Sequence, residues 1–255
     1  HVGMEKIGEI AERGFNLSEM VRSLYELRKL GVECNIYNLG LLLTPEEKDE
    51  TYIPAYILVA KNAVDYLLKD IGKNSNDMLK EELSYEWDST MFSRKHKDNG
   101  KQGVVQKNAR HNVCYADISQ KPDIANGKGT LVNFKDVPLI QHIREKLPTL
   151  LGEYARDLLA EGNKYYDISK CYIGWHGDSE RRKIVGTRVG QPFPLLYNWF
   201  SRFKPVGKRF RVILNNGDLY VMSDKAVGSD WKKSSILTLR HAAGFEDAIS
   251  SKTKI

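Results

Sequence analysis

Two histidines and one aspartate have the types and the spacing of a metal site. His176 and Asp178 are separated by one residue and follow the apolar run at 172–175, and His241 is the only one of the six histidines after them. Alternate side chains of a strand project from one face, so His176 and Asp178 can reach the same site. Two imidazoles and a carboxylate leave three coordination positions open, which suits ferrous iron. A His-x-Asp triplet also occurs as a polar turn after a strand, so the flanking sequence decides.

The elements that position these residues read as strands. After Gly162, short apolar segments alternate with Gly, Asn and Pro turns, which is typical of a small sandwich or barrel. The expected strands cover residues 172–173, 183–186, 193–200, 209–214, 219–222 and 236–239. Residues 215–218, Asn-Asn-Gly-Asp, predict a tight turn between two of them.

The first hundred residues read as mostly helical. Apolar residues recur at helical spacing over 17–30, with a plausible cap at Asn16 to Ser18, and a short strand is expected at 33–37. Further helices are expected to start at Thr44-Pro45, to run from 56 to 68 as one core-packing helix, and to cover 77–82.

Two further segments complete the prediction. Residues 137–147 predict an amphipathic helix whose pattern continues through 150–159 up to Gly162, with His142 packed on it rather than acting as a ligand. Residues 93–107 are polar, lysine-rich and punctuated by glycine, so they predict a loop. That loop is either a solvated connection or a lid whose charges contact a nucleic-acid backbone.

Length and composition bound the class of protein. The 255 residues, 41% hydrophobic and 28% charged, fit one large soluble domain or a core with an added subdomain. No apolar run approaches the ~18 residues of a membrane span, and no secretory leader is visible. Three scattered cysteines argue for a reducing compartment and against structural zinc, so we expect an intracellular protein, cytoplasmic or nuclear. The net charge of +6 permits a polyanionic partner.

Four segments form an ordered set of motifs. Residues 108–117 hold an arginine and then Tyr-Ala-Asp, and 163–181 hold an Asn-x-Tyr pair followed by His-x-Asp-x-Glu-Arg. Residues 188–193, Arg-Val-Gly-Gln-Pro-Phe, contain a glycine after an expected strand, and residues 216–223 contain Gly-Asp-Leu-x-x-Met. In this order, over roughly residues 105 to 245, they resemble the AlkB-like branch of the 2-oxoglutarate- and Fe(II)-dependent dioxygenases.

The resemblance implies a fold, an activity and a set of site residues. The fold would be α+β, with a double-stranded β-helix (a jelly roll, cupin-like) backed by helices. The chain would then divide into a mostly helical region at 4–104 and the dioxygenase domain at 105–255. Residues 1–3 precede Met4 and are expected to be a tag remnant. The cofactors would be Fe(II) and 2-oxoglutarate. With O₂ they would oxidise a methyl or C–H group, on a nucleobase of DNA or RNA, leaving succinate and CO₂; no membrane and no obligate protein partner is expected. The implied residues are His176, Asp178 and His241 for the metal and catalysis, Asn163, Tyr165, Tyr166, Arg240 and Lys254 for 2-oxoglutarate, and Arg110, Tyr115, Trp175, Glu180 and Arg181 for the substrate.

The sequence departs from the family pattern at its end. The family's distal histidine follows a Trp-x-His pattern, but this chain has Trp231-Lys232-Lys233. Either a longer loop brings in His241, with Lys254 near the position of the family's arginine, or Arg240 binds 2-oxoglutarate and the third metal ligand is lost. The spacing from the Asn-x-Tyr pair is one residue long, so either Tyr165 or Tyr166 fills that role.

Other classes of function therefore stay open. One is a dioxygenase that acts on a protein or a small molecule, and another is an inactive jelly-roll module that binds nucleic acid. A third is an enzyme with a different co-substrate.

Overall fold

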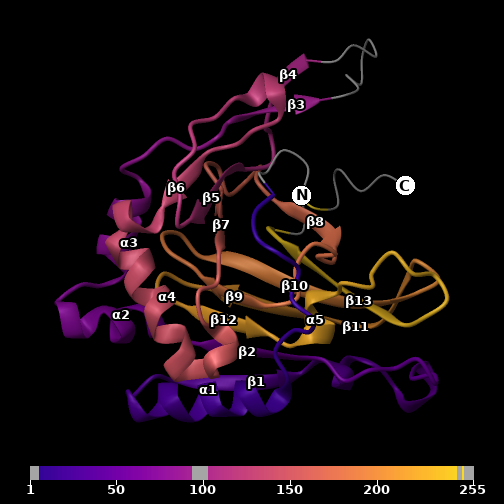
Figure 1. The fold of residues 1–255 in the computed structure, drawn as a ribbon. Coiled ribbons are helices and arrows are strands. Elements are labelled where there is room, and N and C mark those ends of the chain that lie inside the picture. Colours follow the sequence, from indigo (N-terminus) through magenta and orange to yellow (C-terminus); the bar gives the residue numbers. More distant parts are fainter. Residues whose placement is uncertain (1–5, 94–102, 246–248, 250–255) are drawn as a thin grey trace.

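The computed structural model describes residues 6–93, 103–245 and 249, which form an α+β fold (Figure 1). The helices of the described part are α1 (Leu17–Lys29), α2 (Ala63–Leu68), α3 (Ser75–Glu82), α4 (Pro138–Leu151) and α5 (Asp224–Val227). The strands before the His-x-Asp segment are β1 (Cys34–Asn38), β2 (Tyr56–Ala60), β3 (Thr90–Ser93), β4 (Gly103–Gln106), β5 (His111–Ala116), β6 (Leu131–Asn133) and β7 (Ala160–Lys164). Those that contain or follow it are β8 (Ile173–His176), β9 (Ile184–Thr187), β10 (Phe193–Ser201), β11 (Lys204–Leu214), β12 (Leu219–Met222) and β13 (Thr238–Ala243).

Two four-stranded antiparallel sheets carry the candidate site. One has the strand order β1-β2-β12-β9 and the other β11-β10-β13-β8. Along the chain the pairs are nested: β10 pairs with β11, β9 with β12, and β8 with β13, so successive pairs alternate between the two sheets. A smaller sheet, β6-β5-β7, and the β3–β4 hairpin lie outside this pair.

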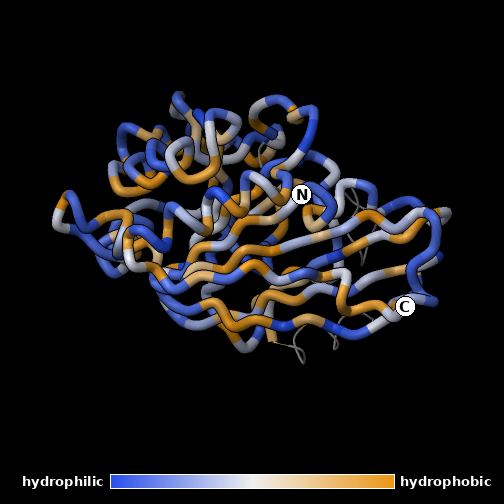
Figure 2. Tube along the Cα trace, turned by 90° about the horizontal axis from the view of Figure 1, so that it is seen from below, coloured by the Kyte–Doolittle hydropathy of each residue, from blue (hydrophilic) through white to orange (hydrophobic). Residues whose placement is uncertain are grey.

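The molecule is built in layers around the sheet that contains β2. Side chains of β2 at 58 and 60 pack with α1, α2 and α4, while those at 57 and 59 pack with the inner side chains of β10 and β13. This sheet is therefore covered by helices on one face and by the second sheet on the other. Hydrophobic segments accordingly follow the strands and the helices, and many of the connecting loops are hydrophilic (Figure 2).

Residues 56–68 are not the single helix that their apolar content predicts. Residues Tyr56–Ala60 form a central strand, and only Ala63–Leu68 are helical. A strand buried on both faces is a continuous apolar run, and such a run cannot be distinguished from a buried helix by periodicity alone. The turn between the two lies at Asn62, whose φ of 51° is left-handed.

The other predicted elements of the N-terminal half agree better. The helix at 17–30 is confirmed as α1, and Asn16 caps it in a box with Glu19. The strand at 33–37 and the helix at 77–82 are confirmed as β1 and α3, but Thr44-Pro45 starts only a three-residue 3₁₀ turn. Because β1 and β2 share a sheet with β9 and β12, the region before residue 104 is not purely helical.

Two predicted segments end differently from expectation. Helix α4 stops at Leu151, because Gly152 takes a φ of 88°, and residues 160–164 form β7 instead of continuing the helix. The loop predicted at 93–107 is wrong at its ends, because Ser93 closes β3 and residues 103–106 form β4, which pairs with β3. Its residues 94–102 lie outside the described residues, as do 1–3 and Lys254. Among the described residues, no helix combines the length and the apolar character that a membrane crossing requires.

Candidate metal centre

His176, Asp178 and His241 converge on one point between the two sheets. His176 ends β8 and is the register partner of His241 on β13, while Asp178 follows β8 by two residues. His176 Nε2 lies 3.7 Å from Asp178 Oδ1, and His241 Nε2 lies 3.4 Å from Asp178 Oδ2. One donor atom from each residue fits within 4.8 Å of the others. The sequence prediction that these three residues lie together is therefore met in the structure.

Burial sets the protonation of this triad. The side chains of His176, Asp178 and His241 are only 16%, 5% and 7% exposed. Burial lowers the pKa of His176 to about 4, and the neighbouring His241 charge adds to this. Burial alone would raise the pKa of Asp178, but the hydrogen bond and charge of His241, together with the charge of Arg181, hold it at about 2. At neutral pH the triad therefore offers a neutral His176 imidazole and an ionised carboxylate.

Contacts outside the triad fix the ligand orientation. The ring atom Nδ1 of His176 lies 2.7 Å from the carbonyl oxygen of Gly174, which makes Nδ1 the donor and leaves Nε2 to accept a metal. The backbone N–H of Asp178 donates to the carbonyl oxygen of Val227 at 3.0 Å, which ties the ligand to α5.

Gly177, between the two first ligands, is held by close packing. A Cβ on Gly177 would lie 2.0 Å from the carbonyl oxygen of Gly228 and 2.9 Å from Cβ of Trp231. A side chain at this position would displace the backbone that holds Asp178. The identity of the middle residue in His-Gly-Asp is therefore a requirement of local packing.

Among the residues expected to bind 2-oxoglutarate, Asn163 and Tyr165 make contacts within the fold, whereas Tyr166 is exposed. Asn163, on β7, accepts hydrogen bonds at Oδ1 from Nε of Arg110 (2.8 Å) and from the side chain of Asn112 (2.7 Å). Tyr165 packs its ring 4.2 Å from that of Phe193, and burial raises its pKa to about 12.

Tyr166 lies outside this group. It is 46% exposed, stacks on His111 and donates to the carbonyl oxygen of Asn108. Of the two tyrosines left open by the spacing, only Tyr165 faces the interior.

Arg240 is on the wrong face of β13 to act beside His241. Neighbouring residues on a strand point to opposite faces, and the Arg240 guanidinium lies 4.2 Å from the ring of Phe200 and 5.2 Å from that of Trp231. The alternative in which Arg240 binds 2-oxoglutarate and the third metal ligand is lost does not fit this arrangement, because Arg240 points away from His176 and Asp178. His241 places its imidazole beside Asp178, so that two imidazoles and one carboxylate could hold a metal ion here.

Three of the five residues expected to contact substrate are close to the triad. The charge of Arg110 contributes to the low pKa of His176, and the charge of Arg181 to that of Asp178. Arg181 donates to Glu161 at 2.6 Å and to Glu180 at 3.4 Å. The two glutamates therefore offset the charge of Arg181 beside the triad.

The two aromatic residues expected to contact a base are not brought to the triad. Tyr115 is 3% exposed, its hydroxyl shares a hydrogen bond with that of Tyr85, and its ring packs 6.2 Å from that of Phe134. Trp175 precedes His176 on β8 and packs on the opposite face of the sheet, 6.1 Å from Phe200. Both positions are corrections to the sequence prediction, and the cause is strand alternation for Trp175 and core burial for Tyr115.

Sequence reasoning missed three polar residues near the site. Tyr197 is the register partner of His241 on β10, is fully buried, and has no hydrogen-bond partner for its hydroxyl among the described residues. Tyr220 is close enough for the charge of Asp178 to help raise its pKa. Arg188 packs over Tyr165 and Phe193. For Tyr197 and Tyr220 the available signal was a tyrosine within a largely apolar strand, whereas Arg188 follows β9 and gave no such signal.

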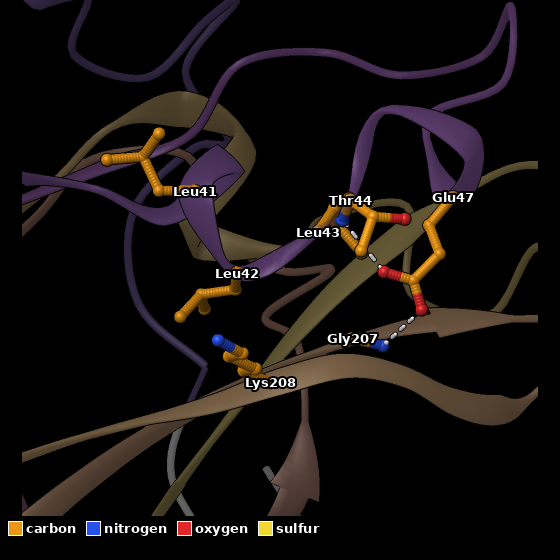
Figure 3. A pocket seen from close by; sticks show the side chains of 7 residues that line it. All are labelled: Leu41, Leu42, Leu43, Thr44, Glu47, Gly207 and Lys208. Atoms are coloured by element: carbon orange, nitrogen blue, oxygen red, sulfur yellow. Dashed lines mark hydrogen bonds between the residues drawn. The ribbon is translucent and has the colours of Figure 1, made fainter.

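Two surface hollows lie elsewhere. One, of about 290 Å³, is formed by the 3₁₀ segments near residues 41–47 and by Gly207 and Lys208 of β11. There Glu47 accepts hydrogen bonds from the backbone N–H groups of Thr44 and Gly207 (Figure 3). The other, of about 560 Å³, is lined by residues of the β6 region and by Ser84 and Tyr85. No triad residue lines either hollow.

A comparison with known proteins places the chain in a family. Uncharacterized protein R156 of Acanthamoeba polyphaga mimivirus is 38% identical over 249 residues, which cover 96% of this chain and 90% of that protein. The chain belongs to the family of this mimivirus protein. No protein-family model matches the chain. The relative's name assigns no activity, so the chemistry rests on the geometry of the triad.

Proposed function

We propose that the protein is an Fe(II)- and 2-oxoglutarate-dependent dioxygenase similar to the AlkB-like enzymes. The observation that carries the proposal is the convergence of His176, Asp178 and His241 from β8, the segment after it, and β13. Two neutral imidazoles and one carboxylate on one side of an ion are the donor set of non-haem iron oxygenases. Cysteine-rich and all-carboxylate donor sets, which favour other metals, do not match these three residues.

The donor separations fit an ion held at adjacent coordination positions. Ligand atoms about 2.1 Å from a metal and at right angles to one another are about 3.0 Å apart. The observed separations of 3.7 Å and 3.4 Å from Asp178 to the two imidazoles exceed this by under an ångström, and the three donor atoms together lie within 4.8 Å of one another. The side chains would have to draw together to close the set around an ion. Bound iron would supply the activation of O₂, while His176, Asp178 and His241 hold it and leave one side open.

The strand order supports the proposed fold. The nested pairs β10–β11, β9–β12 and β8–β13, alternating between two facing sheets, are the winding of a ribbon folded over itself. We infer that this is the double-stranded β-helix of the AlkB-like enzymes, in which the metal ligands stand between the sheets.

Cations near the triad are available for the carboxylates of 2-oxoglutarate. With Arg240 facing away, we assign this role to Arg188 and Arg110. Arg188 packs on Tyr165 and Phe193, and its charge acts on Tyr220, which lies near Asp178. An arginine offers a bidentate contact to a carboxylate, which a lysine cannot.

We propose a nucleobase of DNA or RNA as the carrier of the oxidised methyl or C–H group. The net charge of +6 supports a polyanionic substrate. Because the triad is 16% exposed or less, a base would have to be single-stranded or turned out of a duplex to reach it. Loss of formaldehyde would follow oxidation of an N-methyl group, and a C-methyl group would retain the hydroxyl.

The experiment measures metal binding and turnover on the same samples. Anaerobic Fe(II) titration of the full chain should give one site, and succinate should form from 2-oxoglutarate in the presence of methylated single-stranded oligonucleotides. His176→Ala and Asp178→Ala should lose both. The matched control is His142→Ala, because His142 is paired with Asp70 on the surface of α4. No metal binding by the wild type contradicts the proposal, whereas metal binding without succinate favours the inactive binding module.

A further inference from the structure

We propose that Tyr197 is a positioning residue of the candidate metal centre and that its hydroxyl orients the imidazole of His241. The hydroxyl oxygen accepts the Nδ1–H of this imidazole when Nε2 holds a metal ion. The inference rests on the metal site of the proposed function, but not on its co-substrate or its reaction.

Two buried polar atoms beside the triad have no hydrogen-bond partner among the described residues. They are the hydroxyl oxygen of Tyr197 and the ring nitrogen Nδ1 of His241. Tyr197 is fully buried and the side chain of His241 is 7% exposed, so bulk water does not satisfy these atoms. A buried polar group without a partner costs stability, and in a native protein such a group calls for an explanation.

The two residues are neighbours on adjacent strands. Tyr197 on β10 is the register partner of His241 on β13, so their side chains leave the sheet on the same face (Figure 1). The centroids of their rings are 5.8 Å apart, and the ring planes are tilted by 55°. Burial raises the pKa of the Tyr197 hydroxyl well above its usual value, and the charges of Tyr220 and Asp178 add to this. The hydroxyl end of the ring therefore lies on the side of the triad.

The two imidazoles of the triad differ in the contact of their outer nitrogen. Nδ1 of His176 lies 2.7 Å from the carbonyl oxygen of Gly174, which fixes that ring. A histidine that binds a metal usually donates its other N–H to an oxygen, and this contact sets the tautomer and the orientation of the ring. Nδ1 of His241 has no such contact among the described residues, and the hydroxyl of its register partner Tyr197 can supply it.

A hydroxyl suits this position because metal binding reverses the role of Nδ1. In the metal-free protein Nε2 of His241 faces the Asp178 carboxylate at 3.4 Å, and a carboxylate only accepts, so the proton is on Nε2 and Nδ1 has a lone pair. When Nε2 binds a metal, the proton is on Nδ1, which then needs an acceptor. A hydroxyl can donate to the first form of the ring and accept from the second.

The hydrogen bond belongs to the metal-bound state. Both atoms are unpaired in the structure, and the triad has to draw together to close around an ion. A phenylalanine at position 197 would fill the same space without burying an unpaired hydroxyl. The hydroxyl of Tyr197 is therefore explained by a contact that forms when the site is loaded.

The test compares Tyr197→Phe with the wild type as full chains. The variant loses one oxygen atom and keeps the ring, which packs 6.3 Å from that of Phe210. We expect its Co(II) affinity, measured by competition with a chelator, to fall about 10- to 100-fold, the range for loss of an outer contact to a ligand. Without metal it should melt no lower than the wild type, because the hydroxyl has no partner to lose. A role confined to packing predicts the reverse, a lower melting temperature and an unchanged affinity.

Tyr85→Phe is the matched control. The hydroxyl of Tyr85 shares a hydrogen bond with that of Tyr115, outside the triad. Its removal leaves a buried hydroxyl unpaired. This variant should therefore melt below the wild type and bind Co(II) as tightly as the wild type does.

Proton NMR of the Co(II)-loaded protein reports on the hydrogen bond itself. The unpaired electrons of Co(II) shift the Nδ1–H signals of both ligated histidines out of the crowded part of the spectrum, and both signals disappear in D₂O. In Tyr197→Phe one of them should be lost or exchange faster with water. The other, from His176 bonded to Gly174, should remain and serves as the internal control.

The outcomes separate this inference from the metal site on which it rests. Equal Co(II) affinity of Tyr197→Phe and the wild type, or two N–H signals that the substitution does not change, overturns the role of Tyr197 and leaves the metal centre in place. Failure of the wild type to bind Co(II) overturns the metal centre itself, and this inference with it.

Discussion

Replacement of Gly177 by alanine tests whether the packing between the first two ligands builds the metal centre. The new Cβ would meet the carbonyl oxygen of Gly228 at 2.0 Å and its carbonyl carbon at 2.7 Å, where ordinary contacts begin near 3.4 Å. Both obstacles are backbone, so the clash cannot be relieved by turning a side chain. Either the chain after α5 moves outward or the His-Gly-Asp segment moves, and both break the hydrogen bond from Asp178 to Val227.

The size of the effect follows from the packing of the site. Overpacking a closely packed position typically costs about 1–3 kcal/mol. For a chain of this length each kcal/mol lowers the melting temperature by about 2–4 °C. We therefore expect Gly177→Ala to melt about 2–12 °C below the wild type. We also expect it to bind Fe(II) or Co(II) at least tenfold more weakly, because the carboxylate of Asp178 moves with the backbone.

Gly103→Ala is the matched control for this experiment. Gly103 lies on β4, its φ is not left-handed, and an added Cβ would meet nothing within 4 Å. Thermal melting and anaerobic metal titration are measured on both variants. If Gly177→Ala matches Gly103→Ala in melting temperature and in metal affinity, the close approach of the two backbones does not hold the ligand set, and the reasoning fails.

Three further predictions concern stability. Burial lowers the pKa of His176 to about 4 from near 6.5, so between these pH values the unfolded chain binds a proton that the folded chain does not. The free energy of unfolding of the metal-free protein should therefore fall by up to about 3 kcal/mol as the pH drops from 7 to 4. Urea titrations at several pH values measure this fall, and His176→Gln, which lacks the titrating group, is the control. Asp218→Ala removes the buried acceptor of two backbone N–H groups and of Lys61, so it should lower the free energy of unfolding by about 3 kcal/mol, and an unchanged urea midpoint would contradict this. Lys225→Met leaves Asp230 without its 2.7 Å partner and should cost about 3 kcal/mol, whereas adding Asp230→Leu should recover part of the loss in the same assay.

The candidate metal site was accessible from the sequence because it depends on strand periodicity. His176 and Asp178 are two residues apart, and the only histidine downstream is His241, so few alternatives existed. The same periodicity excludes Arg240 once His241 is a ligand, since adjacent strand residues face opposite ways. Trp175, next to His176, is excluded from the site for the same reason. The sequence alone allowed either His241 or Arg240 to point to the site. Only the pairing of β8 with β13, which sets His241 opposite His176, shows that His241 does.

Other features depend on contacts between distant segments and were out of reach. Residues 56–60 are apolar throughout because β2 is covered on both faces, and this burial comes from α1, α4 and β10, none of which is local. The role of Gly177 depends on Gly228, which lies about fifty residues away in the chain. The register pairing of Tyr197 with His241 likewise follows only from the order of the strands.

The register of β13 decides which of its side chains reaches the candidate metal site. Along this strand His241 lies beside Asp178 and Arg240 packs on Phe200 at the opposite face, so a slip of one residue would exchange them and destroy the site. Lys225 opposes such a slip, because its buried ammonium donates to the carbonyl oxygen of Leu237, immediately before the strand, and to Asp230. The buried ion pair therefore fixes which side chains of β13 face the triad. Loss of Lys225 should accordingly weaken metal binding, although the residue does not belong to the triad.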